Sequence, residues 1–538
     1  MKSDIDEFLK PLSLDEEKAH ALAHEFCRSF QHLSTDSLDQ FLPTPISESI
    51  LRPTAGREKG RYLAIDIGGT NLRVGFVELL GNEIDGDSNG VNGTNGVVNG
   101  TNGANGGLNH SYSESLPNIR RILEKSWPIL EVLKNENADS LFTWIGSCIA
   151  EVVREGCEKL NLPRDLELPM GVTFSFPMVQ DTLSDATLMA MGKGFAITSR
   201  LQLGTHLING YEKSKTPDLP PIKVAAILND AVATLVSFIY QSREDNTHKA
   251  AMGLICGTGS NATIPLKRST LHKDKQLRKV KVLNGDSTDD MKIAVNTEWS
   301  INGTAPPLRK FGLISQWDTR LDSEGEAPGF QPLEYMTSGR YLGELGRLML
   351  LNYLEHHLNI PTHALPPRLL TRFGLTTTFL SHFKPPNATA LLEKLEAEFP
   401  SSTENSFQWT EEIALVLFDI SKAIEVRAAG IVAAAVVGLL MCAGDIPLRQ
   451  STQSTTNGHA KLEQRPKVNL IVGYTGGCIV HFQDYLADCQ KFLDAIIEAE
   501  FGEDTPVRVV LSPCHDGGIT GAGVLCGASQ AKSRDSDV

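Results

Sequence analysis

Short apolar runs alternate with longer helical segments along most of the chain. The runs rich in β-branched residues, bounded by glycine and polar residues, predict strands. The predicted strands are 62–67, 72–79, 171–176, 224–228, 252–256, 468–472 and 507–511, and the predicted helices are 14–33, 119–133, 138–160, 231–241, 339–354, 410–443 in two pieces and 482–499. Alternation of strands and helices is typical of an α/β protein.

Two polar stretches interrupt this pattern. Residues 85–109 repeat Asn-Gly with Thr and Val, a composition that buries too little apolar surface to offset the entropy of ordering it. We expect a disordered surface loop there and a shorter loop of the same kind at 450–466.

The length and charge of the chain limit its organisation and its partners. A chain of 538 residues is longer than one hydrophobic core usually supports, so we expect an N-terminal part over 10–227, with the Asn-Gly insert, and a C-terminal part over 228–530. The net charge of −15 predicts a surface that repels nucleic acid and anionic lipid. Neither is expected as a partner, and the sequence leaves the oligomeric state open.

Several features predict a cytoplasmic protein. The first 18 residues carry acids throughout and do not resemble a secretory signal. Nine cysteines, an odd number, lie mostly in apolar runs, which favours reduced thiols over a disulfide framework. The apolar run at 428–444 is shorter than the ~20 residues of a membrane span and predicts a buried helix rather than membrane insertion.

The segment LAIDIGGTNLRVGFVEL at 63–79 predicts two strands joined by a tight turn, with Asp66 near the end of the first strand, just before the turn. Glycine lets backbone amides approach a phosphate closely, and the charged fork of Arg73 suits phosphate oxygens. Asp66 is a candidate to hold a bound Mg²⁺ through water. An ordinary Gly-Gly hairpin is the alternative. The candidate phosphate-binding residues of the turn are Gly68, Gly69, Thr70 and Asn71.

The segment LICGTGSNATI at 254–264 repeats this arrangement, with Gly257, Thr258 and Gly259 between two predicted strands. A Gly-Thr-Gly sequence by itself is more often a tight turn. Two such hairpins in separate lobes, however, could hold one polyphosphate from opposite sides through backbone amides.

The segment AAILNDAVATL at 225–235 predicts a buried strand that delivers Asn229 and Asp230 to its end, just before a helix. Ligands bind at strand ends in α/β sheets. The alternative for Asp230 is an ordinary helix N-cap, although capping does not require the neighbouring asparagine.

The order of these segments resembles the hexokinase family from about residue 14 to residue 530. Seven motifs in the order of that family carry the resemblance. They are EKGRYLAIDIGGTNLRV at 58–74, TFSFP at 173–177, GKGF at 192–195, LNDAVATL at 228–235, GTGSNA at 257–262, VNTEW at 295–299 and LEYMTSGRYLGEL at 333–345.

The resemblance implies the two-lobed fold of the actin-like ATPases, which is ribonuclease H-like, with a five-stranded mixed sheet in each lobe and a sugar cleft between them. Carboxylates and amides suit a ring of sugar hydroxyls because they accept and donate hydrogen bonds in fixed directions. For Glu298 and Glu334, each taken singly, a solvated surface acid is the alternative. The residues that fall on the family's sugar contacts are Ser175, Lys193, Asn229, Asp230, Asn261, Glu298 and Glu334.

The activity implied by the resemblance is phosphorylation of a small-molecule sugar by ATP and Mg²⁺. Asp230 is expected to accept the proton of the 6-hydroxyl as that oxygen attacks the γ-phosphorus. Arg73 and Lys193 are expected to stabilise charge on the transferred group together with the metal ion.

The chain departs from the family pattern at three places. The usual Val-Asp-Gly-Ser of the adenosine segment reads Tyr474-Thr475-Gly476-Gly477, which keeps Gly476 as a candidate ATP contact, and the terminal Asp-Gly-Ser-Gly-Lys-Gly becomes DGGITG at 516–521. Near the sugar, the usual Trp-Thr-Lys-Gly-Phe reads MGKGF at 191–195.

Two hypotheses of different classes fit this sequence. The first is an active hexose or hexosamine kinase. The altered MGKGF segment near the sugar, with GYTGG and HFQDYL further along the chain, resembles the fungal N-acetylglucosamine kinase branch of the hexokinases. The second is a non-catalytic sugar sensor or regulator, which the altered nucleotide motifs favour. The complete set of sugar-contact residues disfavours a third class, an actin-like chaperone or filament ATPase.

Overall fold

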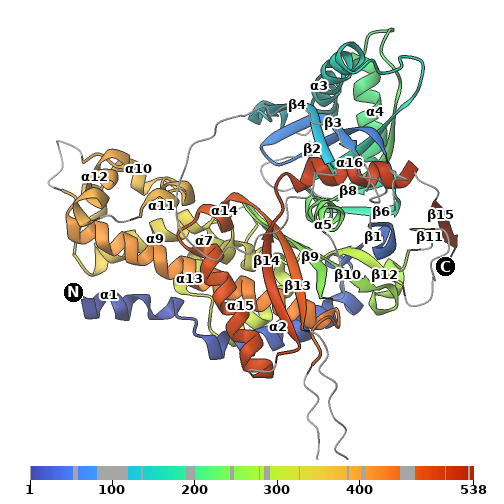
Figure 1. Cartoon of the computed structure of the whole chain (residues 1–538). Helices are drawn as coiled ribbons and strands as arrows, with labels where there is room; N and C mark the ends of the chain where they lie inside the picture. The colour runs from blue at the N-terminus through green and yellow to red at the C-terminus, as the bar shows by residue number, and fades with distance from the viewer. Residues whose placement is uncertain are drawn as a thin grey trace, which may run out of the picture.

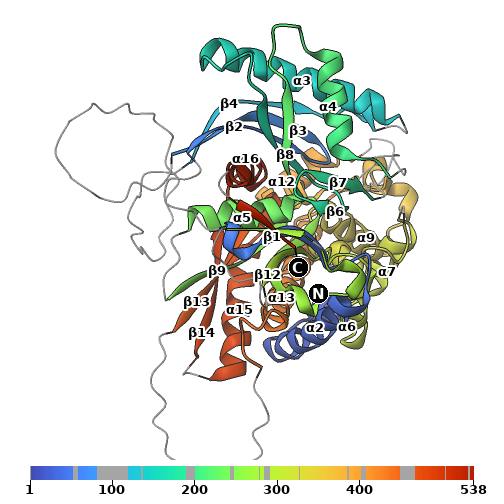
Figure 2. The same cartoon turned by 90° about the vertical axis from the view of Figure 1, so that its right-hand side faces the viewer.

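The chain folds into two lobes with two helices between them (Figures 1 and 2). The helices between the lobes are α5 (Asp230–Gln241) and α16 (Gly517–Gln530). The computed structural model describes residues 2–51, 59–80, 119–134, 137–189, 200–242, 247–277, 279–283, 291–325, 327–384, 387–401, 407–448, 467–502, 505–530 and 533–537.

The smaller lobe contains a five-stranded mixed sheet of order β4-β3-β2-β5-β8. Three strands are antiparallel, and the last two run parallel to β2. Helices α3 (Ala138–Lys159) and α4 (Leu203–Ser214) cover one face of this sheet, and α16 packs on the other. The strands are β2 (Gly60–Ile67), β3 (Asn71–Leu79), β4 (Ile119–Pro128), β5 (Leu168–Phe174) and β8 (Ile222–Leu228).

The larger lobe contains an eight-stranded sheet of order β14-β13-β9-β10-β12-β1-β11-β15. Its first five strands repeat the directions of the smaller sheet, since β9, β10 and β12 are antiparallel and β13 and β14 run parallel to β9. The strands are β1 (Leu42–Ser47), β9 (His248–Cys256), β10 (Ser260–Lys267), β11 (Lys279–Leu283), β12 (Lys292–Asn296), β13 (Val468–Thr475), β14 (Val507–Pro513) and β15 (Ser533–Asp537).

The two-lobed α/β architecture is therefore confirmed, but the expectation of five strands in each lobe holds only for the smaller one. Strand β1 pairs antiparallel with the outer edge of β12, and β11 and β15 continue the sheet from there. Pairing satisfies backbone groups that an exposed edge strand would leave to solvent. The sequence of β12 contains no pattern that indicated that three further strands extend the sheet beyond it.

Helices fill the rest of the larger lobe. Helix α13 (Glu411–Cys442) lies at its centre and packs against α2 (Glu16–Asp36), α9 (Leu342–His356) and α15 (Tyr485–Phe501). The other helices are α1 (Lys2–Leu9), α6 (Ala305–Lys310), α7 (Gln316–Ser323), α8 (Pro332–Thr337), α10 (Pro367–Leu370), α11 (Thr377–His382), α12 (Ala388–Glu398) and α14 (Gly477–His481), and a separate hairpin contains β6 (Met178–Thr182) and β7 (Asp185–Leu188).

Helix α13 corrects the expectation of two pieces at 410–443, because it is one continuous helix of 32 residues. The glycines of α13 do not break the helix. They let neighbouring helices pack closely against it. A Cβ on Gly438 would lie 2.7 Å from the Ala23 carbonyl oxygen of α2. Among the described residues, α13 is the one helix long and apolar enough to cross a membrane, and 94% of its most apolar window is buried inside the protein.

The predicted helix at 119–133 is wrong, because this segment forms the edge strand β4 followed by a short 3₁₀ turn at Glu131–Leu133. The register between β3 and β4 shifts between Val74 and Phe76, so β4 carries one extra residue opposite Gly75. Leu123, at φ 51°, lies in this bulge. The extra residue breaks the two-residue alternation and gives apolar residues a spacing that resembles a helix.

The remaining strand predictions and the cysteine prediction agree with the structure. Each of the seven predicted strands corresponds to an observed one within a few residues. All nine cysteines are free, and all but Cys442 are buried. The predicted loops at 85–109 and 450–466 lie outside the described residues, and the boundary between 227 and 228 stays a prediction.

We predict that Gly438→Ala destabilises the larger lobe by about 1–3 kcal/mol, because its methyl group would push α13 and α2 apart. Gly346→Ala in α9 is the matched control, since its Cβ would meet flexible side-chain ends rather than backbone, the nearest being Leu380 Cδ1 at 3.1 Å. Urea denaturation of both variants measures the difference. Equal stability of the two variants would contradict this account of the helix packing.

Candidate active site

The first predicted hairpin places a carboxylate and a guanidinium group directly opposite each other. The four-residue turn between β2 and β3 is closed by the Gly68 amide, which donates to the Asn71 carbonyl at 2.9 Å. This turn aligns Asp66 with Arg73 across the antiparallel pair. The Arg73 guanidinium donates to Asp66 Oδ2 from Nη2 at 2.6 Å and from Nε at 3.2 Å. Thr70 and Asn71 are exposed at the tip.

Arg73 also reaches the C-terminal part of the chain. Its Nη1 donates to Asp516 Oδ1 at 2.7 Å, and Arg121 pairs with the other oxygen of the same carboxylate at 2.8 Å. Asp516 adopts the left-handed conformation, with φ 54°, just before α16. Neither Asp516 nor Arg121 was among the candidate site residues, although the DGG sequence at 516–518 was a signal.

Asp66 is a strongly perturbed acid. Burial raises the pKa of Asp66 above its usual value, the charge and hydrogen bonds of Arg73 oppose this rise, and the negative charge of Asp230 raises the pKa further. The two carboxylates are therefore near enough to interact electrostatically. Because a cation near them would favour their charged forms, Asp66 and Asp230 are chemically suited to hold a Mg²⁺ ion.

Three neighbouring strands end at the same edge of the smaller sheet. The Ser175 amide, just after β5, donates to the Ile67 carbonyl at the end of β2 at 3.0 Å. Strand β8 runs parallel to β5 and ends at Asn229 and Asp230. The structure therefore brings Ser175, Asp66 and Asp230 to one edge.

Asn229, not Asp230, caps helix α5. The Asn229 side chain accepts a hydrogen bond from the Ala231 amide at 2.9 Å, and its backbone is extended. Asp230 is the first helical residue and is partly exposed, and its Oδ1 also accepts a hydrogen bond from the Ala231 amide at 2.9 Å. The capping alternative for Asp230 is therefore wrong: Asn229 performs that role.

The second hairpin meets the segment that carries Gly476. A Cβ on Gly476 would lie 2.3 Å from the Cys256 carbonyl oxygen and 2.6 Å from the Gly257 nitrogen. Its φ of 124° also favours glycine. The Gly257 carbonyl in turn accepts from the Gly339 amide at 2.7 Å, and Thr258 is exposed at the tip. These glycines allow three backbone segments to converge, as a site for a polyphosphate requires.

A hydrogen-bonded polar cluster lies beyond this hairpin, on β10 and after β12. Asn296 donates to Glu298 Oε1 at 2.7 Å, and Asn261 donates to Asn296 Oδ1 at 2.8 Å and to Glu298 Oε1 at 3.4 Å. Glu298 is buried and has a φ of 46°, a strained conformation for a residue with a side chain. Gln40 holds it there by donating to the Glu298 carbonyl at 2.9 Å.

The residue Asn296 was missed by sequence reasoning, although it lies inside the VNTEW motif. Its position two residues before Glu298 was the available signal, because alternate residues of an extended segment share a face.

Glu334 lies beside this cluster, at the start of α8. It accepts a hydrogen bond from the Ser260 amide at 3.1 Å, next to Asn261, and a Cβ on Gly259 would lie 2.8 Å from its Oε2. Both Glu298 and Glu334 are buried rather than solvated. The surface alternative for these two acids is therefore wrong.

Helix α5 connects the two groups of residues. It starts at Asp230, beside the smaller sheet, and packs against β9 so closely that a Cβ on Gly253 would lie 2.8 Å from the Leu235 nitrogen. A core that includes Ala64, Val232 and Ala250 joins both sheets around it. Lys193 lies outside the described residues.

Comparisons with known proteins agree with this geometry. Two family models described as hexokinase match residues 4–240 and 251–528. Hexokinase-1 of Nicotiana tabacum is 26% identical over 486 residues, which cover 89% of this chain and 82% of that protein, and hexokinase-2 of Schizosaccharomyces pombe is 27% identical over 456 residues, covering 82% and 85%. A hexokinase from Schistosoma mansoni complexed with glucose has a similar fold, with a TM-score of 0.70 at 22% identity, covering 98% of both chains.

The chain has the two-lobed actin-like ATPase fold. The family models assign it to the sugar kinases with that fold. Within that class, the chain belongs to the hexokinase family. It is accordingly an ATP-dependent sugar kinase that phosphorylates hexoses.

We predict that Gly476→Ala lowers kcat/KM for ATP by about 10- to 100-fold, because a misplaced loop of this kind loses productive geometry. Gly477→Ala is the matched control, since the nearest atom to its Cβ is His481 Cδ2 at 3.9 Å. Steady-state kinetics with varied ATP measure both variants. An equal effect of the two substitutions would argue against the contact between these loops.

Proposed function

We propose that this chain transfers the γ-phosphoryl group of ATP to the 6-hydroxyl of a hexose or hexosamine, with Asp230 as the general base. The observation that carries this proposal is the division of roles at the end of β8. Because Asn229 caps α5, Asp230 is not required as the cap, and its partly exposed carboxylate is near enough to Asp66 for its negative charge to raise the pKa of Asp66.

Asp230 has the properties that a base in phosphoryl transfer needs. It lies at the N-terminus of a helix of 12 residues, where the helix dipole favours a negative charge. Such a carboxylate can accept the proton of the sugar hydroxyl as the oxygen bonds to phosphorus and the bond to ADP breaks. Asp66 is less suited to this role, because it is buried and paired with Arg73.

The other polar groups have separate roles in the proposal. Asn261, Glu298 and Glu334 bind sugar hydroxyls, with Ser175 and Asn229 completing the set from the other lobe. The hairpins at 68–71 and 257–259, with Gly476, hold the phosphates through backbone amides. Arg73 and Lys193 stabilise negative charge on the transferred group, and a Mg²⁺ ion held through water by Asp66 would neutralise the polyphosphate.

We predict that Asp230→Asn lowers kcat by a factor of about 10² or more while sugar binding changes little, because the amide cannot accept the proton. Stopped-flow turnover and isothermal titration calorimetry with sugar measure the two effects.

A matched variant at the neighbouring residue separates chemistry from folding. Asn229→Ala should cost about 1 kcal/mol of stability through loss of the cap, whereas Asp230→Asn should melt at nearly the same temperature as the unmodified protein. Near-normal turnover in the Asp230→Asn protein refutes the assignment of the base.

We further propose N-acetylglucosamine as the preferred sugar. The support is in the sequence: Met191 and Gly192 stand where the family usually has tryptophan and threonine, and smaller side chains at these two positions would favour a sugar with an acetamido group. Burial of one acetyl methyl contributes only about 1 kcal/mol, so this contact alone gives modest discrimination against glucose.

We predict that kcat/KM is higher for N-acetylglucosamine than for glucose, mannose and glucosamine, and that Gly192→Thr shifts the preference toward glucose. A coupled assay of ADP formation with the four sugars measures both effects. A clear preference for glucose in the unmodified protein would exclude the acetylated sugar as the main substrate and leave the proposed phosphoryl transfer intact.

A further inference from the structure

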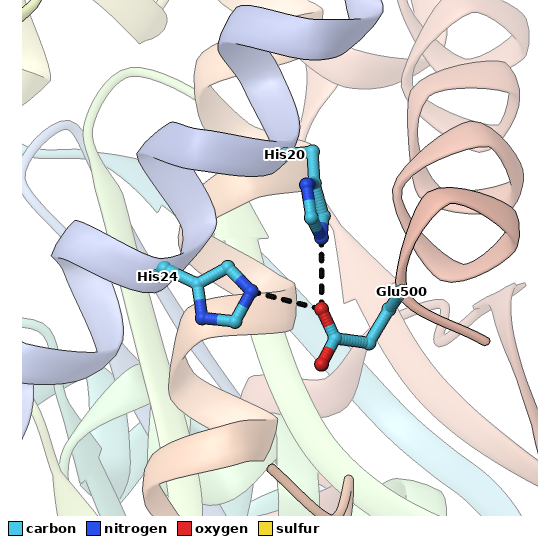
Figure 3. Close-up of side chains that lie close together, drawn as sticks. All are labelled: His20, His24 and Glu500. Carbon is cyan, nitrogen blue, oxygen red and sulfur yellow. Dashed lines mark hydrogen bonds and ion pairs between the residues drawn. The ribbon is translucent and has the colours of Figure 1, made fainter. Parts of the chain in front are cut away.

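Two histidines and one glutamate converge outside the site described above. Helix α2 presents His20 and His24 on one face, because residues four apart are neighbours on a helix. Both imidazoles point toward Glu500, in the last turn of α15 (Figure 3). Each Nε2 lies 2.8 Å from the same atom, Glu500 Oε2.

The burial of this cluster fits an ion that enters from one side. The Glu500 side chain is 4% exposed, whereas His20 and His24 are 27% and 29% exposed. The carboxylate therefore lies at the buried end of the cluster, and the two imidazole rings lie at the end that solvent reaches. The rings themselves meet edge to face, with centroids 5.0 Å apart, so both nitrogens can face one point.

We propose that His20, His24 and Glu500 form a binding site for a divalent zinc ion. Two imidazole nitrogens and one carboxylate oxygen are the donor set of many three-ligand zinc sites, which complete their coordination with water. Imidazole nitrogen favours zinc over Mg²⁺ or Ca²⁺, which prefer oxygen ligands. The site therefore does not compete for the ion that accompanies ATP.

The distances require only a small adjustment on binding. A tetrahedral zinc ion with ligands at about 2.0–2.1 Å separates neighbouring ligand atoms by about 3.3 Å. Each Nε2 would therefore move about 0.5 Å away from the Glu500 oxygen relative to its 2.8 Å hydrogen bond. The ion takes the Nε2 lone pairs, and each imidazole then keeps its proton on Nδ1.

The site is remote from the residues of phosphoryl transfer. Gln490 of α15 bonds to the backbone of β14 at Val509 and Leu511. Glu500 lies ten residues further along α15, about 15 Å away at the rise of a helix, in the direction of the start of β14. Gly476 follows the opposite end of the paired strand β13. Zinc would therefore hold α2 against α15 as a structural ion, independently of the proposed function.

The experiment titrates metal-free full-length protein, without ATP, with Zn²⁺ in competition with a fluorescent chelator, and with Co²⁺ as a spectroscopic probe. Visible Co²⁺ bands of a four- or five-coordinate nitrogen and oxygen site are expected, without a sulfur charge-transfer band. The melting temperature should rise by roughly 2 °C or more at saturating Zn²⁺.

The test variant is His20→Gln with His24→Gln, because the amides can still donate to Glu500 but do not ligate zinc. Zinc affinity should fall at least about tenfold, and sugar kinase activity should be unchanged. The control is His32→Ala, a histidine of the same helix that is 74% exposed and paired with Asp36, which should bind zinc as the unmodified protein does.

Three results would overturn the proposal, two seen with bound metal and one without it. One is equal zinc affinity in the double variant and the unmodified protein, and the other is a sulfur charge-transfer band, which would assign the ion to cysteine. Absence of any zinc binding would leave the three residues as a hydrogen-bonded histidine and glutamate cluster only and would equally refute the site.

Discussion

The ion pair between Arg73 and Asp66 is the interaction on which the arrangement of the site depends. It is made possible by the β2–β3 register, and Arg73 extends it to Asp516, more than 400 positions later in the chain. A lysine could not replace this residue, because a single ammonium group lacks the fork that reaches two carboxylates in fixed directions. The same contact orients the start of α16, which covers the inner face of the smaller sheet.

Small residues are the second constraint, because the two lobes meet through backbone rather than through long side chains. Gly171 lies against the backbone of Ala522, and Gly521 lies against Ala233, so α16 is held closely between β5 and α5. Close-packed contacts of this kind tolerate little change in volume. They fix the position of β5 and α16 relative to α5, at whose start the proposed base lies.

The sequence predicted seven of the strands to within a few residues, because buried strands are continuous apolar runs and their ends carry conspicuous polar residues. It failed where the signal was not local. The bulge in β4 gave an edge strand the apolar spacing of a helix, and the bonds of Asp516 to Arg73 and Arg121 join segments that are far apart in the chain. Asn296 was overlooked because its role depends on contacts with Asn261 and Glu298 in the folded chain, and its position two residues before Glu298 was its one signal in the sequence.

The position of α16 has a consequence for how the protein acquires its shape during synthesis. Residues 60–79 are made early, but the helix that buries their inner face is made some 440 residues later. In the same way, α2 must wait for α13 and α15 before its apolar face is covered. The smaller lobe can therefore complete its core only after α16 has been made, and the larger lobe only after α15 has been made. Such distant pairings slow folding and leave apolar surface exposed in the meantime, which makes the nascent chain a natural client of chaperones.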